Sequence, residues 1–275
     1  MALNTLAVGT AGPRIAFLHG LFGQGRNWNQ IAKALAGPDG TEAQCLLIDL
    51  PDHGRSPWTE EFSFEAYADA VAATLREAAP GETWALVGHS LGGKTAMVVA
   101  LQHPELVDHL VVVDIAPKDY GSLERFEGYI EEMRSLPLDE IETRADAEER
   151  FEEPHPGVKA FLLQNLRSDR SDGRPRWRWQ ANLDLFAADA ARGHESRIAG
   201  WPTSVDALPP YEGPVLWIAG GESPYIDPDD SETMRRHFPL TRQLTIKGAG
   251  HWVHTDAPEI IVEALRRVLG RDDPD

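Results

Sequence analysis

The most constraining feature of the sequence is an apolar run that ends in Gly-x-Ser-x-Gly and leads at once into a helix-forming run. Residues 84–87 read WALV, residues 88–92 read GHSLG, and residues 95–101 read TAMVVAL. This order predicts a strand, a sharp turn and a helix, with the Ser90 hydroxyl held clear of the sheet edge by a strained backbone. Gly88 and Gly92 are small because strand and helix nearly touch there. The alternative is a serine that only caps an ordinary helix.

Strand and helix signals alternate along most of the chain. Short apolar strands are predicted at residues 14–18, 45–48, 84–87, 109–114, 215–219 and 243–246. Unbroken apolar strands that alternate with helices are typical of a mostly parallel sheet with helices on both faces, the α/β class.

The alternation fails between residues 118 and 210, which are rich in Glu, Arg and helix formers. Within this stretch, residues 139–153 predict a single acidic helix with a solvated face. We therefore predict an α/β core of residues 1–117 and 211–275. Residues 118–210 are predicted to form a helical lid over the carboxyl edge of the sheet, without a buried strand.

Charge and composition exclude several classes of protein. The net charge of −18, from 44 acidic and 26 basic residues, argues against nucleic acid or an anionic membrane surface as a partner. Cys45 is the only cysteine, so a disulfide framework is excluded. Neither a leader peptide nor an apolar stretch of roughly 20 residues is visible. We expect a cytoplasmic protein that is a monomer or a homodimer.

A serine hydroxyl becomes a nucleophile only when a base takes its proton. His251 is the predicted base, because it lies in the GAGH loop at residues 248–251, between the last strand and the last helix. The other candidate histidines fit this role less well. His19 and His53 are expected to brace loops, His89 to pack or hydrogen-bond beside the elbow, and His254 to line the pocket mouth.

The acid that orients the base has two candidate places. In many enzymes of this architecture it follows the strand after the lid, but there the sequence reads GGESPYID, with Ser223 where an Asp is usual. Asp114 ends the strand before the lid, which neighbours the nucleophile's strand, so its carboxylate can reach the histidine from the other side. We favour Asp114 over Glu222 and Asp227. The alternative for Asp114 is a cap on the following turn.

An oxyanion needs two backbone N–H donors. Leu91, directly after the nucleophile, supplies one, and the HGLFG loop at residues 19–23 supplies the other through Leu21 or, as the alternative, Phe22. Lys94 is expected to form an ion pair. No metal-binding, phosphate-loop or dinucleotide motif is present, so we predict no metal and no cofactor.

Together these motifs resemble the α/β-hydrolase superfamily across nearly the whole chain. Five segments look like the YbfF-type short-chain esterases, which are related to the mitochondrial abhydrolase-domain 11 proteins: HGLFG (19–23), GHSLGGK (88–94), VDIAP (113–117), GESPYI (221–226) and GHWVH (250–254). In that family the acid lies at the end of the strand before the lid, which the resemblance carries onto Asp114. The resemblance implies a Ser90, Asp114 and His251 triad that hydrolyses small carboxylic esters or thioesters with short to medium acyl groups.

The lid matches the family least, since residues 139–153 and the RPRWRW segment at 174–179 have no counterpart in the motifs. The candidate substrate contacts are Phe22, His89, Trp179, Tyr225 and Trp252, with burial in the core as the alternative for the tryptophans. The same triad would also serve carbon–carbon bond hydrolysis or perhydrolysis of carboxylic acids. A further alternative is a hydrolase fold retained as a binding module without turnover.

Overall fold

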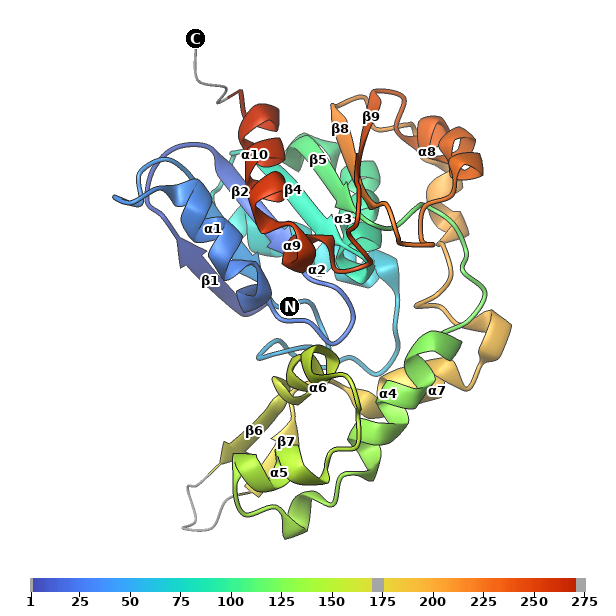
Figure 1. Ribbon diagram of the computed structural model, residues 1–275. Coiled ribbons are helices and arrows are strands. Elements are labelled where there is room, and N and C mark those ends of the chain that lie inside the picture. The colour runs from blue at the N-terminus through green and yellow to red at the C-terminus, as the bar shows by residue number, and fades with distance from the viewer. Residues whose placement is uncertain (1, 170–175, 271–275) are drawn as a thin grey trace.

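The computed structural model describes residues 2–169 and 176–270. At its centre is a seven-stranded sheet in the order β1-β3-β2-β4-β5-β8-β9, in which only β1 runs antiparallel to its neighbour (Figure 1). The strands are β1 (Thr5–Val8), β2 (Arg14–Leu18), β3 (Gln44–Ile48), β4 (Trp84–His89), β5 (Val107–Val113), β8 (Val215–Gly220) and β9 (Thr241–Ile246). The predicted α/β fold with a mostly parallel sheet is confirmed.

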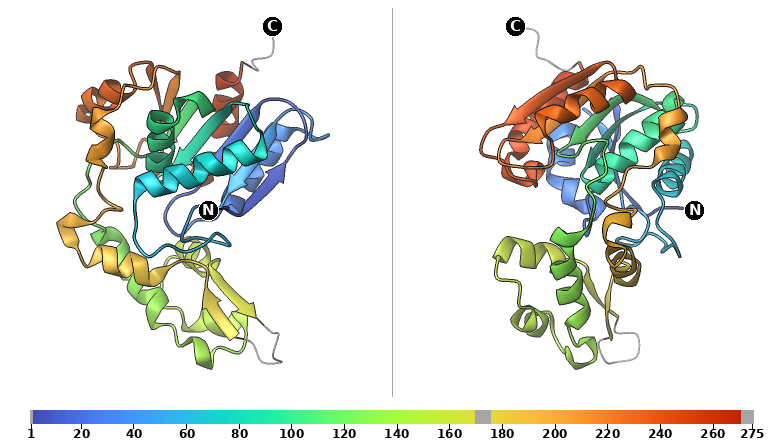
Figure 2. Two further views of the ribbon diagram at one scale, coloured as in Figure 1. Left: turned by 180° about the vertical axis from the view of Figure 1, so that it is seen from behind. Right: turned by 90° about the vertical axis from the view of Figure 1, so that its right-hand side faces the viewer.

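Helices cover both faces of the sheet, as the two views of Figure 2 also show. One face carries α1 (Asn29–Ala36), α9 (Val253–Asp256) and α10 (Pro258–Val268), and the other carries α2 (Phe64–Ala78), α3 (Leu91–Gln102) and α8 (Ser231–His237). Successive strand residues point to opposite faces, so Phe17 joins one buried cluster and Leu18 the other. The unbroken apolar runs in the sequence follow from this double burial.

Strand β1 was not predicted from the sequence. It lies at the edge of the sheet and three of its four residues are exposed, so it has no apolar run to mark it. Its pairing with β3 is antiparallel, from Thr5 opposite Ile48 to Val8 opposite Cys45.

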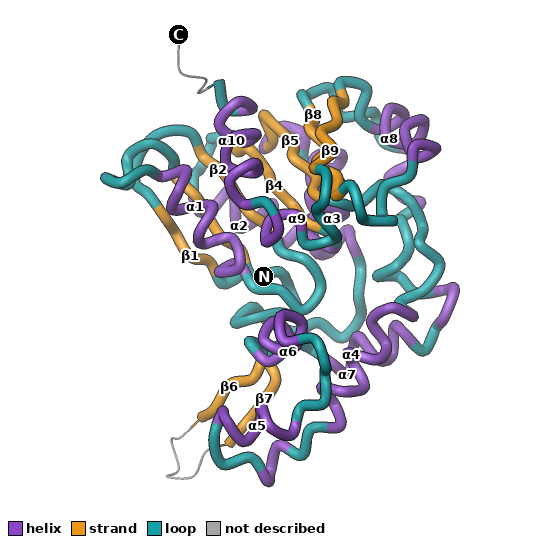
Figure 3. Tube along the Cα trace, viewed as in Figure 1, coloured by secondary structure: helices purple, strands orange, loops and turns teal. Residues whose placement is uncertain are grey.

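Residues 118–210 form an insertion between β5 and β8, and the part of it that carries α4 to α7 stands apart from the sheet (Figure 3). It contains α4 (Glu124–Ser135), α5 (Arg144–Arg150), α6 (Pro156–Leu163) and α7 (Leu183–Ala190), and also a hairpin of β6 (Leu166–Asp169) and β7 (Arg176–Trp179). The expectation of a purely helical insertion was therefore wrong. The hairpin buries only Leu166 and Trp179, which is too little for an apolar strand pattern.

The single acidic helix predicted over residues 139–153 is also wrong. A short 3₁₀ turn, Leu138–Glu140, is followed by Ile141, which is buried in the core. Thr143 then begins α5, since its hydroxyl accepts a hydrogen bond from the N–H of Asp146. The apolar anchor and the new cap divide the acidic segment in two.

Buried polar contacts fasten the insertion to the core. The side-chain amide and the backbone N–H of Asn182 donate to the carboxylate and carbonyl of Asp52, at 2.7 and 2.9 Å. The side chain of Asn165 accepts from Gln24 and donates to the carbonyl of Phe22, both at 2.8 Å. Among the described residues, no helix is both long and apolar enough to cross a bilayer.

The predicted close approach of β4 and α3 at the serine turn is confirmed. A Cβ atom added to Gly88 would lie 2.2 Å from the carbonyl oxygen of Gly92, and one added to Gly92 would lie 2.5 Å from the carbonyl oxygen of His19. These contacts are with backbone atoms, which cannot rotate away.

Replacing Gly88 by Ala should lower the free energy of unfolding by about 3 kcal/mol, because strand and helix must be forced apart. Gly128→Ala is the matched control, since a Cβ there meets nothing within 4 Å and lies inside α4. That change should leave stability unchanged or raise it by up to about 1 kcal/mol. Urea denaturation measures both, and a Gly88→Ala protein as stable as wild type would contradict the steric argument.

Candidate active site

Ser90 sits at the turn between β4 and α3 with φ 52° and ψ −117°, a conformation that side chains rarely adopt. Its backbone N–H donates to the carbonyl of Val113 at 3.1 Å, which fixes the turn against the end of β5. Phe22 and Asp114 also have positive φ, 60° and 54°. Backbone strain of this kind gathers at functional sites.

Asp114 follows β5 and is fully buried. One carboxylate oxygen accepts the backbone N–H of Gly220 at 2.9 Å. The other accepts Nδ1–H of His251 at 2.8 Å and the hydroxyl of Ser223. The carboxylate therefore has three donors, one at the end of β8, one in the loop after β8 and one in the loop after β9, which offset the loss of water around a buried charge.

His251 lies in the loop after β9. Because Nδ1 faces the carboxylate, its Nε2 is left as the acceptor of a proton. The ring of Tyr225 stacks on the imidazole with centroids 4.0 Å apart, and Nε2–H of His89 donates to the carbonyl of His251 at 2.8 Å. The imidazole is thus held by its ring face, its Nδ1 and its backbone.

The backbone N–H groups of Leu21, Phe22 and Leu91 have no hydrogen-bond acceptor within the part of the chain that the structure describes. A turn closed by Gly23 N–H on the carbonyl of Gly20 presents the first two. His19 braces this loop as predicted, since its Nε2 accepts the N–H of Leu50 at 3.0 Å. Free, fixed donors of this kind can stabilise an oxyanion.

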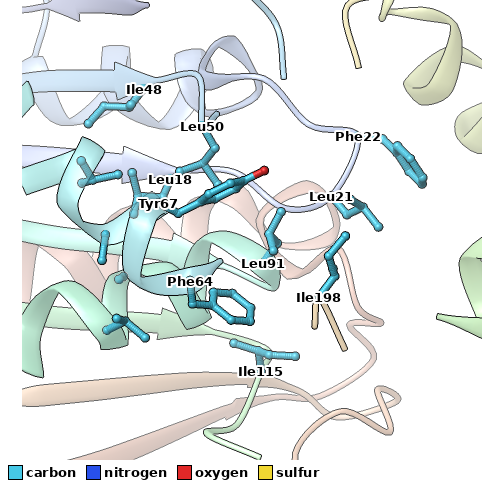
Figure 4. Packing of buried hydrophobic residues seen from close by; sticks show 14 of the residues in the cluster. Leu18, Leu21, Phe22, Ile48, Leu50, Phe64, Tyr67, Leu91, Ile115 and Ile198 are labelled. Carbon is cyan, nitrogen blue, oxygen red and sulfur yellow. The ribbon is translucent and has the colours of Figure 1, made fainter. Parts of the chain in front are cut away.

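Two cavities meet at Ser90. The larger, about 310 Å³, is lined by Leu21, Leu91, Leu123 and Ile198 among others, and Figure 4 shows Leu21, Leu91 and Ile198 near one another at one side of the core. The smaller, about 20 Å³, is lined by both Ser90 and His251, with Phe22, His89 and Trp252. A third hollow of about 790 Å³ lies at the amino ends of β8 and β9 and contains neither Ser90 nor His251.

Four of the five predicted substrate contacts line the cavities at Ser90, and one does not. Phe22, His89, Tyr225 and Trp252 line the two cavities at Ser90, and His89 already uses Nε2–H on the His251 carbonyl. Trp179 does not: it packs against Phe151 and lines a separate pocket, so its place in the hairpin contradicts a contact at Ser90.

Other sequence expectations are corrected by the same geometry. Lys94 forms no ion pair with any described residue, and its ammonium donates instead to the carbonyls of Ala199 and Gly200, each at 2.6 Å. Glu222 and Asp227, the alternative acids, are exposed, and Asp227 caps a 3₁₀ turn. The sequence did not predict that Ser223 donates to Asp114. Its position in the loop that usually carries the acid could have indicated this contact. Among the described residues, no His, Cys, Asp and Glu cluster could hold a metal.

Comparisons with known proteins identify the class. Residues 13–258 match the family model of the alpha/beta hydrolase fold, and the chain belongs to that family. It is an enzyme of the carboxylic ester hydrolase class, because its relatives are esterases and lipases along nearly its whole length.

Three matches are the most informative. The chain is 35% identical to the mouse (Mus musculus) sn-1-specific diacylglycerol lipase ABHD11, over 94% of this chain and 81% of that protein. It is 30% identical to esterase YbfF of Escherichia coli K12, covering 93% and 92% of the two chains. The solved structure of a marine microorganism esterase superposes with a TM-score of 0.86 at 30% identity, covering 98% and 99%. The resemblance inferred from the motifs is confirmed.

Burial keeps several histidines near the site neutral in the folded protein. Burial lowers the pKa of His53 to about 3 and that of His254 to about 4, and it also lowers the pKa of His19 and of His89. Histidine in an unfolded chain titrates near pH 6.5, so below that pH these histidines bind protons in the unfolded chain but not in the folded protein.

We expect stability to fall as the pH drops from about 6.5 toward 4, because each such histidine can contribute up to about 1.4 kcal/mol per pH unit. His53→Gln should flatten this slope, whatever it does to stability at neutral pH. Urea denaturation of both proteins across the range provides the comparison. Parallel profiles for wild type and variant would show that His53 does not remain neutral in the fold.

Proposed function

We propose that this enzyme is a serine carboxylesterase in which Ser90 is the nucleophile, His251 the base and Asp114 the acid. The observation that carries the proposal is the hydrogen bond from Nδ1–H of His251 to buried Asp114, beside a cavity that Ser90 and His251 both line. The names of the relatives, esterases and lipases, support the same chemistry.

The reaction follows from these positions. Ser90 Oγ attacks the ester carbonyl while Nε2 of His251 takes its proton, and Asp114 stabilises the imidazolium that forms. The oxyanion is held by the N–H of Leu91 and by that of Leu21 or Phe22. His251 then protonates the leaving alcohol, and a water activated by the same nitrogen releases the acid from the acyl-enzyme.

The substrate is proposed to carry a short to medium acyl chain on a small alcohol or thiol. The 310 Å³ cavity next to Ser90 has apolar walls from Leu21, Leu123 and Ile198, which suit an acyl chain of limited length. Leu123 and Ile198 come from the insertion, and we propose that residues 118–210 act as a lid over this site. The cytoplasmic location, and a monomer or homodimer as the working form, stay predictions from the sequence.

Replacing the triad residues gives the direct test, with hydrolysis of p-nitrophenyl acetate and butyrate as the measurement. Ser90→Ala should lower kcat by about 10⁶-fold because it removes the nucleophile. Asp114→Asn should lower it by about 10⁴-fold, because His251 is no longer held in the tautomer that can accept the serine proton. Glu222→Gln is the matched control and should keep the wild-type rate, because that carboxylate is exposed.

An Asp114→Asn enzyme with most of its rate would put the acid after β8 instead. If wild type fails on every ester, a panel of vinylogous diketones and a perhydrolysis assay would test the rival chemistries of the same triad. No turnover of any of these, and no reaction with a serine-directed phosphonate, would leave a binding module.

Widening the acyl cavity should shift chain-length preference. Leu123→Ala removes a wall at the beginning of α4, so kcat/KM for p-nitrophenyl octanoate relative to acetate should rise by about fourfold for each further methylene buried. Leu136→Ala removes the same atoms from a buried leucine at the other end of α4, outside both cavities, and should leave the ratio unchanged. Equal ratios in the two variants would place the acyl chain elsewhere.

A further inference from the structure

A second pocket lies where the β6–β7 hairpin of the insertion meets the loop after β3. It has a volume of about 700 Å³ and shares no residue with the cavities at Ser90. Its walls carry three arginines, Arg55 from the core and Arg167 and Arg178 from the hairpin, and we call it the arginine pocket. Trp58 and Trp179 also line it. Arg178 and Trp179 belong to the RPRWRW segment, which matches none of the esterase motifs.

Two of these arginines face each other in the hairpin. Arg167 of β6 is directly opposite Arg178 of β7 in the strand register, so both side chains stand on one face of the hairpin. Like charges directly opposite each other destabilise a strand pair. Arg26 and Arg144 add further positive charge nearby. Burial lowers the pKa of Arg26, and the charges of Arg167, Arg144 and Arg55 lower it further, whereas the charge of Asp49 raises it.

No described carboxylate forms an ion pair with Arg55, Arg167 or Arg178, and Arg167 donates only to the neutral side chain of Gln180, at 2.6 Å. Arg144 differs in that it pairs with Glu148.

The carboxylate oxygens of the two acids in the adjoining loop accept hydrogen bonds from other, neutral groups. Asp49 accepts from Asn4 and from the backbone N–H of Gly25 and Arg55. Asp52 accepts from Thr59, Tyr67 and Asn182. Three neighbouring arginines without an ion-pair partner among the described residues stand out in a chain with a net charge of −18.

We propose that the arginine pocket binds a small phosphate ester. The guanidinium group of arginine can donate two parallel hydrogen bonds to two phosphate oxygens. A phosphate monoester also carries close to two negative charges at neutral pH, so it balances several arginines better than one carboxylate does. Trp58, with 52% of its surface exposed, offers a flat apolar wall for the organic part of the ligand. The acidic protein as a whole is repelled by anionic membranes, which favours a free ligand over a lipid headgroup.

The site is separate from ester hydrolysis. One wall comes from the core and the other from the insertion, so a bound phosphate would tie the two together and raise the melting temperature. Because Ser90 is not part of the pocket, Ser90→Ala should bind the ligand as wild type does. Failure of the esterase proposal and failure of this one are therefore distinguishable.

The test is calorimetric titration of the whole protein with inorganic phosphate and with glycerol 3-phosphate, together with melting temperatures. Arg178→Gln and Arg167→Gln should each weaken binding roughly tenfold, whereas Arg235→Gln, an exposed arginine on α8, should not. Arg178→Lys should restore only part of the loss, since an ammonium lacks the fork. Binding should weaken as the pH falls through about 6, where phosphate loses its second charge, and as salt rises.

Two results would overturn the proposal: no binding of either probe by wild type, or equal binding by wild type and Arg178→Gln. Vesicles of phosphatidylcholine with and without phosphatidate decide the source. Sedimentation of wild type, but not Arg178→Gln, with phosphatidate vesicles would overturn the assignment to a free ligand. Binding of glycerol 3-phosphate with no sedimentation would support it.

Discussion

The buried carboxylate of Asp114 is the constraint on which the rest of the site depends. A charge with no access to water is costly unless hydrogen-bond donors replace the water, and here the donors are Gly220 at the end of β8, Ser223 in the loop after it, and His251. Each donor is separated from Asp114 by more than 100 residues of chain. The buried charge of Asp114 is therefore compensated only when the sheet is fully assembled. The hydrogen bond between Asp114 and His251 also sets the orientation of the imidazole.

The strand order makes that assembly possible. β4, β5 and β8 are parallel neighbours, so the loops after them open at one edge of the sheet. Ser90 and Asp114 follow the first two strands, and Gly220 ends the third. The Ser90 N–H bonded to Val113 shows how closely the loops pack. In this arrangement two strained residues, Ser90 and Asp114, are held by backbone hydrogen bonds from neighbouring strands.

The insertion contributes walls to both the cavity at Ser90 and the arginine pocket. It supplies Leu123 and Ile198 to the cavity at Ser90, and Arg167 and Arg178 to the arginine pocket. One of its attachments is the hydrogen bond from Asn165 to the carbonyl of Phe22, in the loop that holds the free N–H groups of Leu21 and Phe22. The position of the insertion and the shape of the site are thus coupled through the backbone of residues 21–23.

The sequence by itself determined the alternation of strands and helices, the serine turn, and the loops that carry Asp114 and His251. These are local features: apolar runs, glycines at a tight turn and residues at strand ends follow from neighbouring side chains. The edge strand β1 and the hairpin β6–β7 gave no such signal, since each buries few apolar residues.

Contacts between distant parts of the chain were decided only by the tertiary structure. In the structure Ser223 donates to Asp114, and Lys94 donates to two carbonyls instead of pairing with a carboxylate. Trp179 lies in a pocket away from Ser90, and Arg55 lies beside the hairpin. Sequence patterns describe which face of an element is apolar. They do not state which polar group of another element will meet it, because that depends on the packing of the whole chain.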